Sequence, residues 1–252
     1  MPLRTSTFKI RALTADSLFS LQLLTAVLSL IAGSLDVITY LGFGGLFAAH
    51  ITGNLVILAA HVAAGAPAQV AAILSVPVFL LLLGVAKVFA GMLETRGYAS
   101  LRPLLLLQFL FLAAFLSLVE SGPVDATSKI RLVGGLLGVS AMAVQNALVQ
   151  ISIKGAPGTA VMTTNMTHFI LDVGTVLYRA DREAIDEARN RASKTWPSLV
   201  GFTAGCGFGA ICEFQFGLYS LLLPTVLSVF AIALTTWSNG EQEGQRRCSR
   251  GC

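Results

Sequence analysis

The sequence predicts an all-α fold: a polytopic bundle of transmembrane helices with six to eight membrane segments and an internal two-fold repeat. Of the 252 residues 55% are hydrophobic and 12% are charged, whereas soluble domains carry roughly 25% charged residues. Apolar runs of about 20 residues recur along the chain, and as helices they can cross roughly 30 Å of hydrocarbon. The third observation is that similar residues recur in the two halves of the chain.

Eight apolar segments follow one another along the chain, and Gly and Pro residues mark several of the breaks between them. The second and sixth are the least regular, because polar residues and glycines interrupt them. If these two are re-entrant, six segments cross the membrane; otherwise eight do. The segments span residues 18–41, 43–64, 70–93, 103–119, 131–153, 158–178, 197–214 and 217–237.

We therefore divide the chain into two membrane halves, residues 18–120 and 131–238, joined by a linker at 121–130. An N-terminal tail (1–17) and a basic C-terminal tail (239–252) flank them. The segment 179–194 within the second half carries mixed charges and is expected to be a solvated cytoplasmic linker. Its good helix formers leave a short exposed helix as the alternative.

The distribution of basic residues predicts the orientation of the chain. With eight crossings, thirteen Lys and Arg residues lie on the side of the two tails and three on the other side. Because cytoplasmic loops are enriched in Lys and Arg, both termini should be cytoplasmic. Six crossings would also leave the tails on one side, so the bias does not by itself choose between the two topologies.

The internal repeat rests on matches whose offset changes only at loops. Asp36-Val37 aligns with Asn146-Ala147, and Ile51-Thr52 aligns with Met166-Thr167. Four crossings in each half would give the halves the same orientation, whereas three crossings and a re-entrant segment would invert one half. Inverted repeats are common in ion-coupled carriers. Further matches, at an offset of 121, join Gly84, Tyr98 and Pro103 to Gly205, Tyr219 and Pro224.

The stretch from residue 33 to residue 54 is the part around which the chain is organised, because it places polar residues and glycines in an apolar region. An ionisable side chain in hydrocarbon costs ~2.5 kcal/mol or more unless it faces a partner or a wet cavity. Non-helical backbone at membrane depth likewise needs protein or water around it. We therefore expect a broken helix here and at residues 157–168, and a polar site between the halves.

Two motifs resemble the YoaK-like family of bacterial membrane proteins of unknown function. One is Gly33-Ser-Leu-Asp36 with Phe47 and Ile51-Thr-Gly-Asn54; the other is Val144-Gln-Asn-Ala147 with Thr163-Thr-Asn-Met-Thr167. The resemblance extends from about residue 21 to about residue 237, although His168 stands where a second T-G would often occur. It implies a membrane fold and the bacterial inner membrane, and it implies no reaction.

The candidate substrate-binding residues are the polar side chains of these two regions. In the second half, Thr164, His168 and Asp172 are spaced i, i+4 and i+8, which places them on one helical face. His168 and Asp172 could then pair, and we expect Asp36 to face the second-half elements between Asn146 and Thr167. The full set is Asp36, His50, Thr52, Asn54, Gln145, Asn146, Thr164, Asn165, Thr167, His168 and Asp172.

The resulting hypothesis is a secondary transporter or permease for a small polar solute or ion. The alternative is a non-transporting membrane scaffold or sensor, in which these groups only hydrogen-bond between helices. We expect no enzyme, metal site or cofactor, because the chain has no nucleophile elbow, no His-Glu-x-x-His and no metal-spaced cysteine pair. The expected partners are the lipid bilayer and the solute, with a second copy of the chain as a further candidate and no nucleic acid.

Two further patterns have structural explanations. Gly201, Gly205 and Gly209 repeat every four residues, as Gly134 and Gly138 do, and small residues at that spacing let helices approach closely. Lys87 lies within the third apolar segment, where its long side chain is expected to extend toward the membrane surface.

Overall fold

A computed structural model describes residues 15–67, 69–121, 129–153, 155–178 and 181–248, and in these residues it contains helices and no strands. The predicted N-terminal tail and the 121–130 linker fall mostly outside them. The eight predicted segments each correspond to a helix. The elements are α1 (Ala15–Gly42), α2 (Ile51–Ala63), α3 (Val70–Thr95), α4 (Leu101–Glu120), α5 (Lys129–Ser152), α6 (Met162–Leu177), α7 (Arg182–Phe216), the 3₁₀ helix η1 (Gly217–Leu221) and α8 (Leu222–Cys248).

Five stretches of the described residues are long and apolar enough to cross a membrane, which identifies a multi-pass membrane protein. The last of them has 55 residues and contains α7, η1 and the first part of α8. In contrast, α2 has 13 residues and α6 has 16, which is ~20–24 Å of helix and too short for a full crossing. The five stretches are Ser20–Gly42, Val70–Thr95, Leu101–Glu120, Lys129–Ser152 and Arg182–Thr236.

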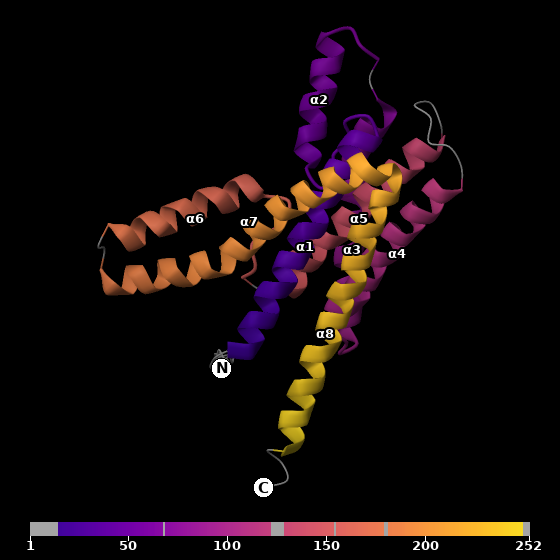
Figure 1. Cartoon of the computed structure of the whole chain (residues 1–252). Coiled ribbons are helices and arrows are strands. Elements are labelled where there is room, and N and C mark those ends of the chain that lie inside the picture. Colours follow the sequence, from indigo (N-terminus) through magenta and orange to yellow (C-terminus); the bar gives the residue numbers. More distant parts are fainter. Residues whose placement is uncertain (1–14, 68, 122–128, 154, 179–180, 249–252) are drawn as a thin grey trace, which may run out of the picture.

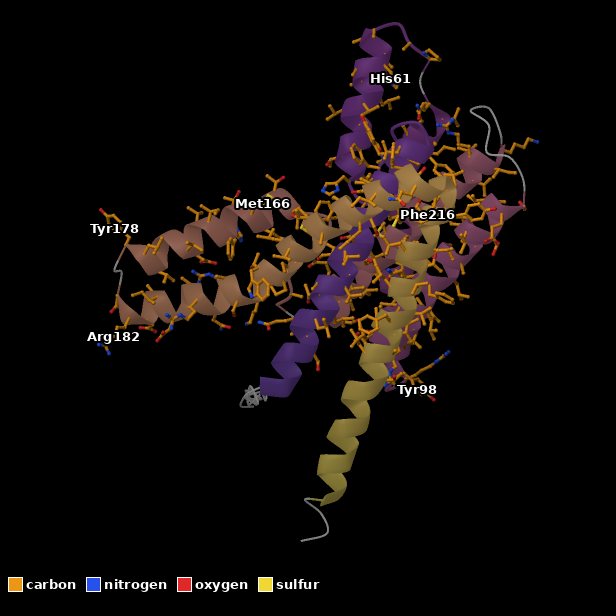
Figure 2. The ribbon with its side chains drawn as sticks, viewed as in Figure 1. His61, Tyr98, Met166, Tyr178, Arg182 and Phe216 are labelled. Carbon is orange, nitrogen blue, oxygen red and sulfur yellow. The ribbon has the colours of Figure 1, made fainter. Side chains whose placement is uncertain are left out.

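Six long helices form the bundle, and successive ones run in opposite directions. In Figure 1, α1 begins and α8 ends at the same end of the bundle. The helix α1 packs along α7 and α8, and α5 packs along α3 and α4. The two short helices extend away from this bundle: α2 packs on α3 and α6 on the first part of α7 (Figure 1). Figure 2 shows His61 near the tip of α2, and Tyr178 and Arg182 at the tip of the α6–α7 hairpin.

The glycine rows are packing surfaces, as the sequence predicted. A Cβ at Gly201 or Gly205 of α7 would lie 2.3 Å from a backbone carbonyl oxygen of α1, that of Ala26 or Leu30 respectively. At that distance the backbones would have to separate. In α5, a Cβ at Gly134 would lie 2.8 Å from the Phe115 ring of α4. Close backbone contact therefore fixes how α1 and α7 cross.

The segment predicted as a solvated linker at 179–194, with a short exposed helix as the alternative, is helical from residue 182. It forms the first turns of the 35-residue helix α7. Alanines favour a helix here, and packing on α6 supplies tertiary contacts that the sequence did not reveal. At the other terminus, the basic segment continues α8 as far as Cys248.

Candidate functional site

The chain breaks between α1 and α2, as predicted, and the break returns toward α1. Gly44 and Gly45 adopt φ angles of +74° and +85°, a left-handed conformation that glycine adopts without steric penalty. The following Ala48 and Ala49 are buried. This turn brings the backbone of residues 48–50 beside the last turns of α1, where the Asp36 side chain lies.

Asp36 and His50 form a buried pair at this break, which we call the Asp36 centre. Asp36 is 3% exposed. One carboxylate oxygen accepts a hydrogen bond from the backbone N–H of Ala49 at 2.6 Å, and the other pairs with His50 Nδ1. Both partners come from the same linker, so the linker itself offsets the unfavourable burial of the carboxylate.

The Asp36 centre also touches the second half of the chain. The His50 ring lies edge-on to Phe202 of α7, with 5.3 Å between ring centroids. One turn before Asp36, a Cβ at Gly33 would lie 2.3 Å from the carbonyl oxygen of Phe202. The pair is therefore situated at a close contact between α1 of the first half and α7 of the second half.

His50 lies in the linker, outside the spanning helices, and its environment favours the charged form. The hydrogen bond to Asp36 raises the pKa of His50 above its usual value; burial opposes this shift, and the negative charge of Asp36 adds to it. His50 is thus held as an imidazolium to higher pH than a free histidine. The ionised pair carries no net charge, so neither group is an unpaired charge in the protein interior.

Asn54, at the start of α2, forms hydrogen bonds with the chain at this break. Its Oδ1 accepts a hydrogen bond from Phe47 N, and its Nδ2 donates to Phe47 O, both at 2.8 Å. Nδ2 also donates to Ser75 Oγ of α3 at 3.0 Å. Asn165, the fourth residue of α6, likewise donates from Nδ2 to the carbonyl seven residues earlier, that of Gly158, at 2.8 Å. The two asparagines are thus structural anchors of the two short helices.

Asp172 belongs to a second cluster, in the α6–α7 hairpin. Arg191 donates to Asp172 Oδ1 from Nε at 3.0 Å and from Nη2 at 2.8 Å. The predicted partner, His168, is instead exposed. The other oxygen, Oδ2, is buried without a hydrogen bond from any described residue. An adjoining cavity of about 380 Å³ is lined by Gly155, Ala156, Pro157, Asn165, His168, Asp172, Arg191, Lys194 and Thr195.

Gln145 forms a buried network that joins α5 to α1 and α4. Its Nε2 donates to Leu28 O at 2.9 Å and to Thr159 Oγ1 at 3.2 Å, and its Oε1 accepts from Gln108 Nε2 at 2.8 Å. Asn146 bonds only within its own helix, to Met142 O at 3.1 Å. Bonds of this kind hold helices together and need no solute.

The predicted site residues therefore form separate clusters. His50 joins Asp36, whereas the hydrogen bonds of Asp36 go to the linker and none joins it to a described residue of α6. Thr52, Thr164 and Thr167 are exposed on the short helices.

Sequence reasoning missed several residues of these clusters, among them Arg191 and Gln108. Arg191 follows Asp172 by 19 residues, a separation that gives no local signal. Gln108 could have been found, since it is a lone amide within an apolar segment. No group of three His, Cys, Asp or Glu side chains in the described part of the chain could hold a metal ion.

The comparisons with known proteins identify a family and no reaction. No curated protein and no solved structure matches the chain. Residues 24–234 match the family described as "Protein of unknown function (DUF1275)", which agrees with the YoaK-like resemblance. This match covers both halves and all eight α-helices in whole or part, and the chain therefore belongs to the DUF1275 family.

Proposed function

We propose that the protein is a secondary transporter or permease for a small polar solute or ion, with proton exchange at the Asp36 centre. The observation that carries the proposal is the buried Asp36–His50 pair at a break in the helical path, against α7 of the other half. Titratable groups in membrane interiors mark ion or proton pathways. A structural role alone would be served by a neutral amide, as it is at Gln145.

We infer that the two halves form an inverted two-fold repeat, an arrangement that would support this proposal. The first helix of each half packs on the third helix of the other, as α1 on α7 and α5 on α3, and α1 and α5 run in opposite directions (Figure 1). The ends of α3 and α7 differ by 121 residues, as do the starts of α4 and α8. Inverted repeats with interrupted helices at their interface are typical of secondary transporters.

The asparagine anchors correct the register of this repeat. Thr52-Gly53-Asn54 corresponds to Thr163-Thr164-Asn165, at an offset of 111, because both asparagines bond to the carbonyl seven residues earlier. This register differs by four residues from the alignment of Thr52 with Thr167. In the corrected register His168 and Asp172 follow the T-x-N motif and have no counterparts in its first copy.

The topology that we propose has six crossings, with α2 and α6 as short elements that do not span. With six crossings, the order of the segments along the chain places fourteen Lys and Arg residues on the side of the tails. Only Lys129 and Arg131 lie on the other side, and Lys87 lies inside α3. This asymmetry exceeds the thirteen to three that eight crossings give. It favours six crossings, cytoplasmic termini and insertion in a bacterial inner membrane.

In the proposed mechanism the protonation state of the pair controls the linker of residues 43–50. While His50 is an imidazolium and Asp36 a carboxylate, their ion pair and the Ala49 N–H bond hold the linker on α1. A proton added to Asp36 removes the carboxylate charge and weakens both interactions. The linker and α2 are then free to move relative to α7, which couples a proton to a conformational change.

The alternative, a scaffold or sensor without transport, is favoured by one observation. Gln108 and Gln145 form a fully buried amide network that requires no solute, and Asp36 could belong to the same structural class. In that case a second copy of the chain could cover the exposed apolar side chains of α6, such as Ile170, Leu171 and Leu177.

Reconstitution into liposomes that contain a pH-sensitive dye separates the two functions. Inward gradients of sodium, phosphate, succinate, glycine and glucose would each be imposed, with empty liposomes as the control. The transporter proposal expects at least one gradient to move protons through the protein. Uptake of radiolabelled forms of the same solutes would be measured in parallel. If no gradient moves protons and no labelled solute is taken up, the result would favour the scaffold.

A further inference from the structure

A cavity lies between α3 and α5, away from the clusters described above. Its volume is about 780 Å³, and it is lined by Leu80, Leu83, Gly84, Lys87, Glu94, Ala147, Gln150 and Ile151. From Leu80 to Glu94 it follows α3 for ~21 Å. The Glu94 end lies toward Tyr98, which Figure 2 places at the end of the bundle where α8 also ends.

Lys87 supplies a positive charge to this cavity, and no ion pair with a described residue neutralises it. No ion pair or hydrogen bond joins Lys87 to another described residue. It lies eight residues before the end of α3, or ~12 Å from it. Lys87 and Gln150 are both exposed and line the same cavity. An ammonium group at that depth is costly unless an anion or water accompanies it.

Glu94 does not serve as that anion. Its Oε1 accepts a hydrogen bond from Ser100 Oγ at 3.0 Å, and Ser100 in turn bonds to Ser152 Oγ of α5 at 2.9 Å. These bonds hold the Glu94 carboxylate at the end of α3, two helical turns from Lys87, or ~10 Å along the axis. The Lys87 ammonium is therefore the charged group along the middle of the cavity, and the Glu94 carboxylate lies at one end.

The equivalent helix pair of the other half has no such space. At the matched positions Gly84 and Gly205, a Cβ on Gly205 would lie 2.3 Å from the Leu30 carbonyl oxygen, whereas a Cβ on Gly84 would meet nothing within 4 Å. Two related helix pairs are thus packed differently, α1–α7 closely and α3–α5 with an open cavity. At this matched position the space is present beside Gly84 and absent beside Gly205.

We propose that the α3–α5 cavity binds a small carboxylate or phosphate anion, either a free solute or a lipid head group, with the Lys87 ammonium as its counter-charge. The anion enters from the Glu94 end and lies between Lys87 and Gln150. This inference rests on the proposed transport function, because it names the solute class. Binding is measured without flux, so binding without transport would reject only the transporter, and transport without Lys87-dependent binding would reject only this site.

The free-solute arm uses the full-length protein in a neutral detergent with acetate, phosphate or succinate at constant ionic strength. We expect at least one anion to raise the Tm of the wild type and of Lys87→Arg by about 2–4 °C at saturating concentration. Lys87→Gln should lose this shift, and Lys129→Gln, an exposed lysine outside the cavity, should keep it. Gly84→Leu should fill the cavity and lose the Tm shift. Gly91 has the same free space around it but does not line the cavity, so Gly91→Leu should retain the Tm shift.

The lipid arm uses native mass spectrometry after exchange into mixed phosphatidylglycerol and phosphatidylethanolamine. Selective retention of phosphatidylglycerol by the wild type but not by Lys87→Gln would assign the site to a lipid head group. If neither arm depends on Lys87, the proposal is overturned. It is also overturned if Lys87→Gln changes only the oligomeric state, since a second copy of the chain would then cover the cavity.

Discussion

Asn54 and Asn165 occupy the same position in two helices that are 111 residues apart. Each is the fourth residue of its short helix, and each donates from Nδ2 to the carbonyl oxygen seven residues earlier at 2.8 Å. Both are buried. In each half the side chain of one asparagine replaces backbone hydrogen bonds that the broken helix lacks, so that an irregular chain can exist inside the bundle.

Replacing these asparagines should destabilise the protein, and Asn54→Ala should do so more than Asn165→Ala. Asn54→Ala leaves the N–H and the C=O of Phe47 without partners, at about 1–3 kcal/mol for each unsatisfied group, whereas Asn165→Ala frees one carbonyl. Thermal unfolding in detergent measures both. Thr52→Ala, an exposed change on the same helix, is the control; an Asn54→Ala protein as stable as this control would contradict the anchoring role.

The two matched glycines should respond in opposite ways to one added methyl group. Gly205→Ala forces a Cβ against the Leu30 backbone, and overpacking of this kind costs about 1–3 kcal/mol. Gly84→Ala has free space and should be neutral or slightly stabilising, because alanine favours helices. A thermal-shift comparison of the two variants checks the difference in packing. Equal destabilisation would mean that α3 and α5 are packed as closely as α1 and α7.

The stability of the Asp36 centre should depend on pH with a defined sign. The folded pKa of His50 is raised above 6.5, its unfolded value. The stabilisation from its charged form is therefore complete below pH 6.5 and is lost as the pH rises through the raised pKa. The Tm difference between the wild type and His50→Gln should accordingly be large near pH 6 and shrink at alkaline pH. A difference that grows with pH would contradict the ion pair.

The Asp172–Arg191 pair should hold α6 against α7. Asp172→Asn removes the charge that accepts two Arg191 N–H groups, so the hairpin should open more often. Hydrogen exchange in α6 should then be faster, while exchange in α1 and α5 stays unchanged. Glu187→Gln is the matched control, because Glu187 also contacts Arg191 but at 3.4 Å and on the surface; it should leave α6 as protected as in the wild type.

Much of this architecture was predictable, because hydrophobicity and glycine spacing are local signals. The eight segments, the two breaks and the glycine contacts all followed from such patterns. The start of α7 at Arg182 did not, since tertiary packing on α6 outweighed a charged composition. The sequence also did not predict that the candidate site would divide into separate clusters. Asp36 satisfies its carboxylate through a turn set by Gly44 and Gly45, and sequence spacing alone does not give the direction of such a turn.

Substitution of Asp36 by asparagine tests the central claim most directly. Asp36→Asn retains the volume of the side chain and an oxygen that can accept the Ala49 N–H, but it removes the carboxylate charge. The measurement is solute-driven proton movement in liposomes that contain a pH-sensitive dye, with wild type, Asp36→Asn and Thr52→Ala compared at equal reconstitution and confirmed folding. We predict that the wild type and Thr52→Ala move protons in response to a solute gradient and that a folded Asp36→Asn does not. Wild-type proton movement in a folded Asp36→Asn protein would contradict the proposal that this pair carries the coupling proton.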